Sequence, residues 1–342
     1  MVSGYIIYKA IMVVLIFLIG FGIAAYSTYA ERKVAAFLQD RLGPNKAGPY
    51  GLLQPIADGV KMFMKEEIIP DVSNKFLFIL GPCIAMLTAC MTGVVIPWST
   101  PITIDGVSYP LQITDINIGI LYVFGVVSIG VYGIMIGGWA SNNKFSLLGA
   151  LRASAQMISY EIAMGLSIIA LVMMTGTISL GEIAAQQAGG NWNIIYQPLG
   201  FLIFITCAFA ECNRTPFDLP ECETELVGGY HTEYSSMKLG FYLFAEYVNM
   251  FISSAIISTL YFGGYNMPFI GRFVTDPNML SILGVLFLFG KIFFFIFFFM
   301  WIRWTIPRFR YDQLMHLGWK IFIPLSILNI ILTGAGILFF NR

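Results

Sequence analysis

Six acidic residues lie between Glu211 and Tyr234 of this 342-residue chain, in the segment ECNRTPFDLPECETELVGGYHTEY. They are Glu211, Asp218, Glu221, Glu223, Glu225 and Glu233. A run of charge is usually a solvated surface, but apolar residues such as Phe217 and Tyr234 are interleaved here, and such side chains favour burial. We therefore expect this acidic loop, residues 213–240, to border a chamber and a proton path.

Three carboxylates fall inside or at the ends of long apolar runs: Glu161, Glu211 and Glu246. A charge at the centre of a membrane helix costs about 2.5–3.5 kcal/mol on insertion scales. Burial also raises the pKa of a carboxyl group, and a group that titrates near neutral pH can pass protons. Each carboxylate alone could be a structural ion pair. Three of them beside the acidic loop favour a proton path.

A lysine also lies within an apolar run, at Phe289-Gly290-Lys291-Ile292-Phe293. Its ammonium group either provides the counter-charge for one of these carboxylates or extends to the membrane surface. The position of Lys291, about one-third of the way into the run, leaves both interpretations open.

The elements that must position these residues are membrane helices. Apolar residues make up 58% of the chain and charged residues 11%, against about 25% charged residues in soluble domains. Eight apolar runs approach the roughly 20 residues that a spanning helix needs. They cover about 10–30, 76–97, 116–140, 156–176, 196–212, 241–262, 282–302 and 320–340. The fold class predicted is therefore all-α, a polytopic membrane protein with eight transmembrane helices.

The basic residues indicate how these helices are oriented. Of the 19 lysines and arginines, 15 lie in the alternate loops that begin with the one after the first run, and three lie on the opposite side. Lys291 is the remaining one. The positive-inside rule then places both termini outside and the basic loops in the cytoplasm. Five arginines on the same side as the acidic loop could balance its charge: Arg32, Arg41, Arg303, Arg308 and Arg310.

Two further classes are not supported by these patterns. The net charge of zero gives no indication of nucleic-acid binding. The first apolar run is too long for a signal peptide, and basic residues follow it.

A short amphipathic helix is predicted in residues 51–67. Leu53, Ile56, Val60 and Phe63 recur at steps of three and four residues, whereas Lys61 falls on the other face. Such a helix lies along a membrane surface or packs on a partner protein, and the two placements are compatible. We find no sequence repeat and no soluble domain. Residues 1–342 are expected to form a single membrane domain, with loops 31–75, 141–154, 213–240 and 303–319 on its cytoplasmic side.

Metal-ligating patterns are sparse. The five cysteines form no C-x-x-C pair, and the chain has two histidines, His231 and His316. A zinc, haem or iron–sulfur site made by this chain alone is not expected. Redox chemistry would have to occur in a partner.

Four segments carry a resemblance to a known family. They are AERKVAAFLQDRLGPNKAGPYGLLQPIADGVKMFMKE at 30–66, SAQMISYEIAMGLS at 154–167, AECNRTPFDLPECETELVGGYHTEYSSMKLGFYLFAEY at 210–247 and RWTIPRFRYDQLMHLGWK at 303–320. The chain resembles the H subunits of the bacterial proton-pumping NADH:quinone oxidoreductases, respiratory complex I. The likeness runs through nearly the whole chain and is weakest in the outer loops.

This resemblance implies a membrane subunit of the bacterial inner membrane that is not catalytic alone. It implies a quinone substrate, ubiquinone or menaquinone, a role in electron and proton transport, and FMN and iron–sulfur clusters in partner subunits. Peripheral-arm subunits and neighbouring membrane subunits are the implied partners. By motif, the residues expected at the quinone chamber are Glu31, Arg32, Arg41, Gly59, Glu66, Phe217, Asp218, Glu221, Glu223, Glu225, Glu233, Tyr234, Arg303, Arg308 and Arg310. Glu161, Glu211 and Glu246 match the proton path of the family.

Three alternatives remain from the sequence. A free-standing ion transporter would also hold intramembrane carboxylates, although such folds often contain internal repeats. The equivalent subunit of a related hydrogenase, or of a complex with another electron donor, would share the loop motifs more weakly. A purely structural anchor would tolerate replacement of the carboxylates by amides.

Overall fold

The computed structural model describes residues 2–104, 106–219, 226–268, 274 and 276–340. Glu221, Glu223 and Glu225, which the sequence places in the acidic loop, lie outside the described residues. The described helices are α1 (Val2–Leu38), α2 (Gln54–Met64), α3 (Lys75–Thr92), α4 (Gly119–Ala140), α5 (Lys144–Thr175), α6 (Leu180–Gln186), α7 (Asn193–Tyr196), α8 (Pro198–Glu211), α10 (Ser236–Tyr261), α11 (Pro277–Thr305), α12 (Tyr311–His316) and α13 (Ile323–Phe340).

The prediction of a polytopic helical membrane protein is confirmed. Seven of the described helical segments are long and apolar enough to cross a membrane. One of them joins α12 to α13 through a π-helical turn, Leu317–Phe322. The fifth predicted segment differs from the others, because α8 has 14 residues and its length is only about 21 Å, less than the roughly 30 Å of a bilayer core. The short helix α7 precedes it, and the chain leaves helical geometry between them at Gln197.

Two helices extend further than their apolar runs. The helix α5 begins at Lys144, not near 156, so that most of the predicted loop 141–154 is helical. Asn143 caps its first turn by accepting a hydrogen bond from the amide of Phe145. Small residues allow close packing on this added segment: a Cβ at Gly149 would lie 2.7 Å from the backbone nitrogen of Tyr230. Similarly, α1 continues to Leu38 and carries Glu31 near its end.

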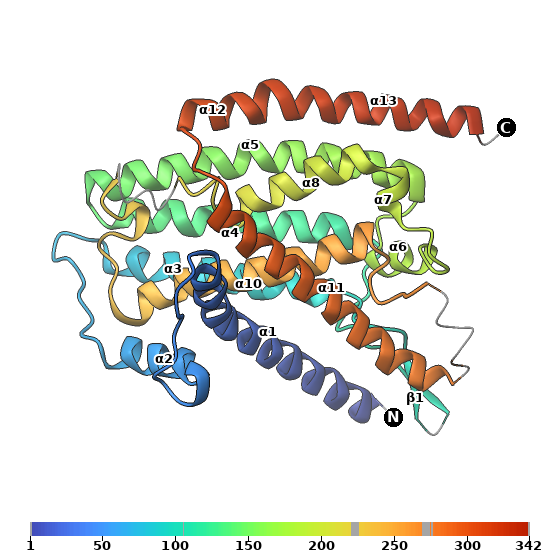
Figure 1. Ribbon diagram of the computed structural model, residues 1–342, viewed down its shortest axis with the longest axis horizontal. Coiled ribbons are helices and arrows are strands. Elements are labelled where there is room, and N and C mark those ends of the chain that lie inside the picture. The colour runs from blue at the N-terminus through green and yellow to red at the C-terminus, as the bar shows by residue number, and fades with distance from the viewer. Residues whose placement is uncertain (1, 105, 220–225, 269–273, 275, 341–342) are drawn as a thin grey trace.

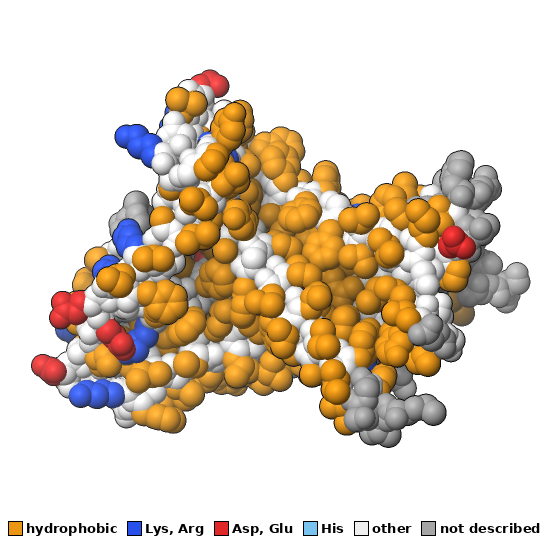
Figure 2. Space-filling view, turned by 90° about the horizontal axis from the view of Figure 1, so that it is seen from below, with side chains coloured by type: hydrophobic (Ala, Val, Ile, Leu, Met, Phe, Trp, Pro, Cys, Tyr) orange, Lys and Arg blue, Asp and Glu red, His pale blue; other side chains and the backbone are white. Residues whose placement is uncertain are grey.

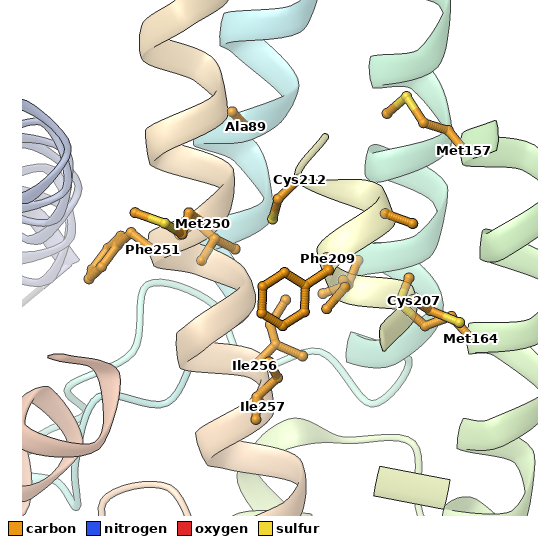
Figure 3. Packing of buried hydrophobic residues seen from close by; sticks show 14 of the residues in the cluster. Ala89, Met157, Met164, Cys207, Phe209, Cys212, Met250, Phe251, Ile256 and Ile257 are labelled. Atoms are coloured by element: carbon orange, nitrogen blue, oxygen red, sulfur yellow. The ribbon is translucent and has the colours of Figure 1, made fainter. Parts of the chain in front are cut away.

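A central bundle of α3, α4, α5, α8 and α10 holds the core, and α1, α11 and α13 lie around it (Figure 1). Figure 3 shows Phe209 of α8 pointing toward Ile256 of α10 within this core, with Cys212 and Met250 nearby. The ring of Phe209 also packs on Phe299 of α11, with centroids 4.2 Å apart. These helices therefore fix the position of Glu211, two residues beyond Phe209.

The surface has a broad apolar region and a charged end. In Figure 2 apolar side chains cover the middle of the face, and charged side chains gather at the left of the view. Figure 1 shows the two chain termini on the same side of the bundle, away from α2. The strands β1 (Ile102–Ile104) and β2 (Val107–Tyr109) pair in an antiparallel arrangement, which the sequence analysis did not predict.

The predicted amphipathic helix is present as α2, somewhat shorter than residues 51–67. Its apolar side chains are exposed, including Ile56, Val60, Phe63 and Met64. Arg32 of α1 forms an ion pair with Asp58 of α2 at 2.7 Å, which links the two helices on their polar side. An exposed apolar face opposite a polar one suits a membrane surface.

Candidate functional site

Four elements meet at the carboxylate of Glu31. The guanidinium of Arg214, which follows α8, lies 3.0 Å from one carboxylate oxygen, and Arg303 of α11 lies 2.5 Å from the other. The hydroxyl of Tyr247 on α10 donates a hydrogen bond of 2.8 Å to the same oxygen as Arg214. Glu31 is 5% exposed. Charge pairs in such a buried place are screened far less than surface pairs.

Arg214 is buried at 2% exposure and lies 4.2 Å over the ring of Tyr247. Burial alone would lower the pKa of its guanidinium, but the negative charges of Glu31 and Glu246 raise that pKa above its usual value. Arg214 therefore stays charged. With Glu31 and Arg303 it forms a buried cluster, which we call the Glu31 cluster, at the end of the bundle where the acidic loop begins.

Beside this cluster, Glu211 and Glu246 line one internal cavity of about 50 Å³. Its polar lining also includes Thr88, Asn213, Asn249 and Ser253. A water molecule occupies about 30 Å³ in the liquid and needs polar partners, so this cavity has the size and the chemistry to hold water. We call it the carboxylate cavity. One oxygen of Glu211, Oε2, is buried without a hydrogen-bond partner among the described residues.

Glu211 also lines a second cavity of about 40 Å³ on the other side. The lining of that cavity is apolar apart from Glu211 and Ser253, and it extends to Ile120 and Leu180. Glu211 thus lies between a polar space and an apolar one.

The structure places the other predicted proton-path carboxylates close to polar partners. Glu246 accepts a hydrogen bond of 3.3 Å from the hydroxyl of Tyr230. Glu161, on α5, is hydrogen-bonded by the hydroxyl of Ser128 on α4. Glu211 and Glu246 share the carboxylate cavity, whereas Glu161 is not among its lining residues.

The described part of the acidic loop is docked on the bundle. Phe217 and Asp218 are buried, and Asp218 forms an ion pair with Arg308 at 2.9 Å. Glu233 accepts a hydrogen bond of 2.6 Å from the side-chain amide of Asn143, and Tyr234 stacks on Phe78 with ring centroids 4.1 Å apart. The predicted pairing of this loop with the basic loop before the last helix is therefore confirmed for Asp218.

The remaining predicted chamber residues lie nearer the surface. Arg41 and Glu66 are exposed, a Cβ at Gly59 would meet nothing within 4 Å, and Arg310 pairs with the exposed Asp312 at 3.1 Å. They surround the buried groups on the same charged end without contacting them in the interactions described. Their exposure leaves them free to meet another subunit or a ligand.

Lys291 pairs with none of the three carboxylates. Its ammonium donates hydrogen bonds to the backbone carbonyls of Phe262, Gly264 and Asn266, at 2.8, 2.6 and 2.8 Å. It also lies 5.4 Å over the ring of Trp192. The side chain therefore holds the turn that follows α10 and forms no ion pair with a described carboxylate. The carbonyls lie beyond the end of α10 and are invisible in the pattern of a single helix.

Sequence reasoning missed several residues of this site. Arg214 was read only as one basic residue of a loop, and Tyr230, Tyr242 and Tyr247 were not assigned. One signal was present: Arg214 lies between Glu211 and Asp218 in an apolar segment, where an arginine needs a buried partner. The identity of that partner depended on the approach of α1, which no local pattern reveals.

This fold and this site define a multi-pass helical membrane protein that holds paired charges and a polar cavity inside its bundle. Comparison with known proteins shows the family to which the chain belongs. A family model described as NADH dehydrogenase matches residues 10–334. The chain is 71% identical over 336 residues to the first of the numbered NADH-quinone oxidoreductase H subunits of Cytophaga hutchinsonii, covering 98% of each chain.

Other relatives agree. The NADH-quinone oxidoreductase H subunit of Flavobacterium johnsoniae is 66% identical over 340 residues, covering 99% of this chain and 97% of the relative. The second of the numbered H subunits of Geobacter metallireducens is 49% identical, covering 97% and 96%. The chain belongs to the H-subunit family of NADH-quinone oxidoreductases, the membrane subunit of respiratory complex I. The expected family and the expected membrane location are thereby confirmed.

Proposed function

We propose that this subunit forms the membrane side of the quinone-binding chamber and passes protons inward through Glu246, Glu211 and Glu161. The observation that carries the proposal is the carboxylate cavity, which brings Glu211 and Glu246 together at the end of the bundle where the acidic loop docks. The names of the relatives supply the quinone and NADH. In this arrangement the FMN and the iron–sulfur clusters belong to partner subunits.

The basic residues of the charged end suit the reduction of a quinone. Two electrons and two protons convert a quinone to a quinol, and the reduced head is negatively charged before the protons arrive. Arg303 and Arg308 each neutralise a carboxylate of this end. A negative quinone head nearby competes with Glu31 and Asp218 for these guanidinium groups. A change in the charge of the quinone head then alters the protonation of the neighbouring carboxylates, because electrostatic interactions are strong where water is excluded.

The orientation follows from the same proposal. The charged end, with loops 31–75, 141–154, 213–240 and 303–319, faces the cytoplasm, where it meets the peripheral-arm subunits. Both termini then lie outside, and the exposed apolar helices contact lipid or the neighbouring membrane subunits that receive the protons. In this proposal residues 1–342 act as a single membrane domain, and NADH binds to a partner subunit.

The test is Glu211→Gln in inverted membrane vesicles, with equal complex content checked by native gel. NADH-driven quinone reduction and proton uptake should fall by about 100-fold, the lower end of what a positioned acid–base group contributes. Oxidation of NADH by an artificial acceptor that bypasses the quinone should persist. Glu182→Gln is a matched control, because Glu182 is a carboxylate outside the carboxylate cavity. Unchanged quinone reduction and pumping in Glu211→Gln would make Glu211 a structural group.

A further inference from the structure

We propose that protons reach the carboxylate cavity from a surface groove between α4 and α5, through the hydroxyl groups of Tyr234 and Tyr242. This phenol relay begins at an open groove and not at the bound quinone, and it supplies the carboxylates with protons from water. It assigns Glu233 and Tyr234, which the family resemblance placed at the quinone chamber, to proton entry instead. It rests on the proposed function of Glu211 and Glu246 as proton carriers.

The outer end of the relay is an open groove of about 360 Å³. Five of its lining residues have polar or charged side chains, Ser141, Asn142, Asn143, Lys144 and Glu233, and the others are Pro70, Val72 and Phe145. The carboxylate of Glu233, held by Asn143, lies in this groove. A carboxylate in contact with water can collect protons and give them to a neighbouring hydroxyl. Ser141 lines the same groove, and its hydroxyl donates a hydrogen bond of 2.8 Å to the carbonyl oxygen of Gly137.

Tyr234 connects the groove to the interior. It is 5% exposed, and its ring packs edge-on against that of Tyr242, with centroids 5.1 Å apart. The two hydroxyl oxygens lie near one point, since a Cβ on Gly137 would fall 2.9 Å from that of Tyr234 and 1.9 Å from that of Tyr242. The hydroxyl of Tyr234 lies 3.0 Å from the carbonyl oxygen of Phe78 and 3.3 Å from that of Gly137. Burial raises the pKa of Tyr234 to about 12. The phenol therefore stays neutral near pH 7 and carries protons as a hydroxyl, not as a phenolate.

Tyr242 completes the connection. Its side chain is 1% exposed and lines the carboxylate cavity together with Tyr230, Glu246 and Glu211. Its hydroxyl donates a hydrogen bond of 3.0 Å to the carbonyl oxygen of Gly133. The hydroxyls of Ser141 and Tyr234 both donate to the carbonyl oxygen of Gly137, and the hydroxyl of Tyr242 lies against the same glycine. These hydroxyl groups therefore form a row from the groove to the cavity that Tyr242 lines.

Glycines make room for the two phenols. A Cβ at Gly137 would lie 1.9 Å from the hydroxyl oxygen of Tyr242 and 2.9 Å from that of Tyr234, and a Cβ at Gly81 would lie 2.4 Å from that of Tyr242. The helices α3 and α4 thus leave a seam into which both hydroxyls fit. A buried hydroxyl costs free energy unless it is hydrogen-bonded, and a phenylalanine ring would fill nearly the same volume without that cost.

The transfer balances at each oxygen. A proton added to the oxygen of Tyr234 from the groove is followed by release of the original hydroxyl proton to Tyr242, which in turn releases its own proton to the cavity. Each O–H bond then rotates back past its backbone carbonyl, Gly137 or Gly133, and is ready for another transfer. One proton leaves the groove, one arrives at the carboxylates, and both tyrosines are unchanged.

The experiment compares Tyr242→Phe and Tyr234→Phe with Tyr261→Phe in inverted vesicles. Tyr261 is a matched control, because it is fully buried in the same helix as Tyr242 and lines neither cavity. Turnover and proton translocation per assembled complex should fall by about tenfold or more in the first two variants, a conservative figure for loss of a proton-transfer group. The rate ratio between H₂O and D₂O should rise, since proton delivery then limits turnover.

If the hydroxyl groups of Tyr234 and Tyr242 only stabilise the helix packing, a different result is expected. In that case the two variants lower the thermal midpoint of the complex, while turnover per complex and the isotope ratio match those of Tyr261→Phe, and the relay is disproved. If Tyr242→Phe does not assemble, Tyr234→Phe and Ser141→Ala decide by the same readouts. Loss of pumping in Glu211→Gln with normal pumping in the tyrosine variants would disprove only the relay. Normal pumping in Glu211→Gln would overturn the proposed function itself.

Discussion

The buried carboxylate of Glu31 needs several partners at once to compensate its charge. Its two oxygens face Arg214 and Arg303, and Tyr247 donates to one of them. Removing one partner of a buried ion pair leaves the other charge without compensation, which costs about 3–5 kcal/mol. The cost differs between the two arginines, because Arg214 is almost fully buried and the side chain of Arg303 is 24% exposed.

The Glu31 cluster therefore gives a ranked prediction. Glu31→Gln and Arg214→Gln should each destabilise the subunit by about 3–5 kcal/mol, and Arg303→Gln by about 1 kcal/mol because water reaches its guanidinium. The measurement is the thermal midpoint of the purified complex together with the amount of this chain in the membrane. Glu182→Gln serves as the neutral control. Equal losses of stability in Arg214→Gln and Arg303→Gln would show that the burial of the arginine does not determine the size of the loss.

At this scale the sequence predicted residue types better than residue partners. Glu31, Asp218 and Arg303 could be nominated by motif, and the structure finds all three in ion pairs. Tyr247 and Ser128 could not, because their roles depend on contacts between helices that lie far apart in the chain. Lys291 illustrates the same point, since its three acceptors are backbone carbonyls with no sequence signature.

Among the helices, α4 depends most visibly on glycine. Gly133 and Gly137 allow α3 and the hydroxyl of Tyr242 to approach its backbone, and a Cβ at Gly138 would lie 2.3 Å from the Cβ of Ala150 on α5. Small residues at helix contacts are how membrane helices pack closely without help from the hydrophobic effect. The spacing of these glycines therefore sets how near α3, α5 and α10 come to α4.

Gly137→Ala should disturb this packing, whereas Gly125→Ala should not. A Cβ at Gly137 meets the hydroxyl of Tyr242 at 1.9 Å, but nothing lies within 4 Å of a Cβ at Gly125 on the same helix. Overpacking of this kind costs about 1–3 kcal/mol. Thermal denaturation of the two variants side by side provides the measurement. Similar midpoints for both would mean that α3 and α10 shift freely to make room.

The apolar runs predicted that these helices exist, but they did not predict the residues at which the helices begin and end. Residues 144–155 of α5 pack through small residues on the loop around Tyr230, so tertiary contacts extend a helix that hydropathy begins at 156. The brevity of α8 has a similar cause. Gln197 interrupts the segment and donates a hydrogen bond of 2.6 Å to Thr333 on α13, a contact that the apolar run itself does not encode.

Over the whole molecule, charge is concentrated at one end of an apolar bundle, and α2 lies at that end (Figures 1 and 2). The fold class could be predicted from composition and the spacing of apolar runs alone. The carboxylate cavity could not, because it forms where α3, α4, α8 and α10 meet, and single-helix patterns do not reveal such meeting points.

Thiol accessibility tests the placement of this end. In inverted vesicles a membrane-impermeant thiol reagent should label Lys61→Cys readily and Phe63→Cys about tenfold more slowly, since water contact governs thiol reactivity. Lys61 and Phe63 lie on opposite faces of α2, and the side chain of Phe63 is 72% exposed without a membrane. Labelling is read relative to the parent chain with its native cysteines. Equal labelling would place α2 away from lipid, and labelling only in right-side-out vesicles would reverse the orientation.

The Glu31 cluster also constrains the order in which the subunit is built. Arg214 is translated 183 residues after Glu31, which takes about 10–40 s at about 5–20 residues per second. Tyr247 and Arg303 follow later still. During that interval the carboxylate lacks both guanidinium groups that it pairs with in the folded subunit, and an uncompensated charge resists burial. The buried surroundings of Glu31, near the end of the first helix to be synthesised, are therefore complete only after α11 has been made.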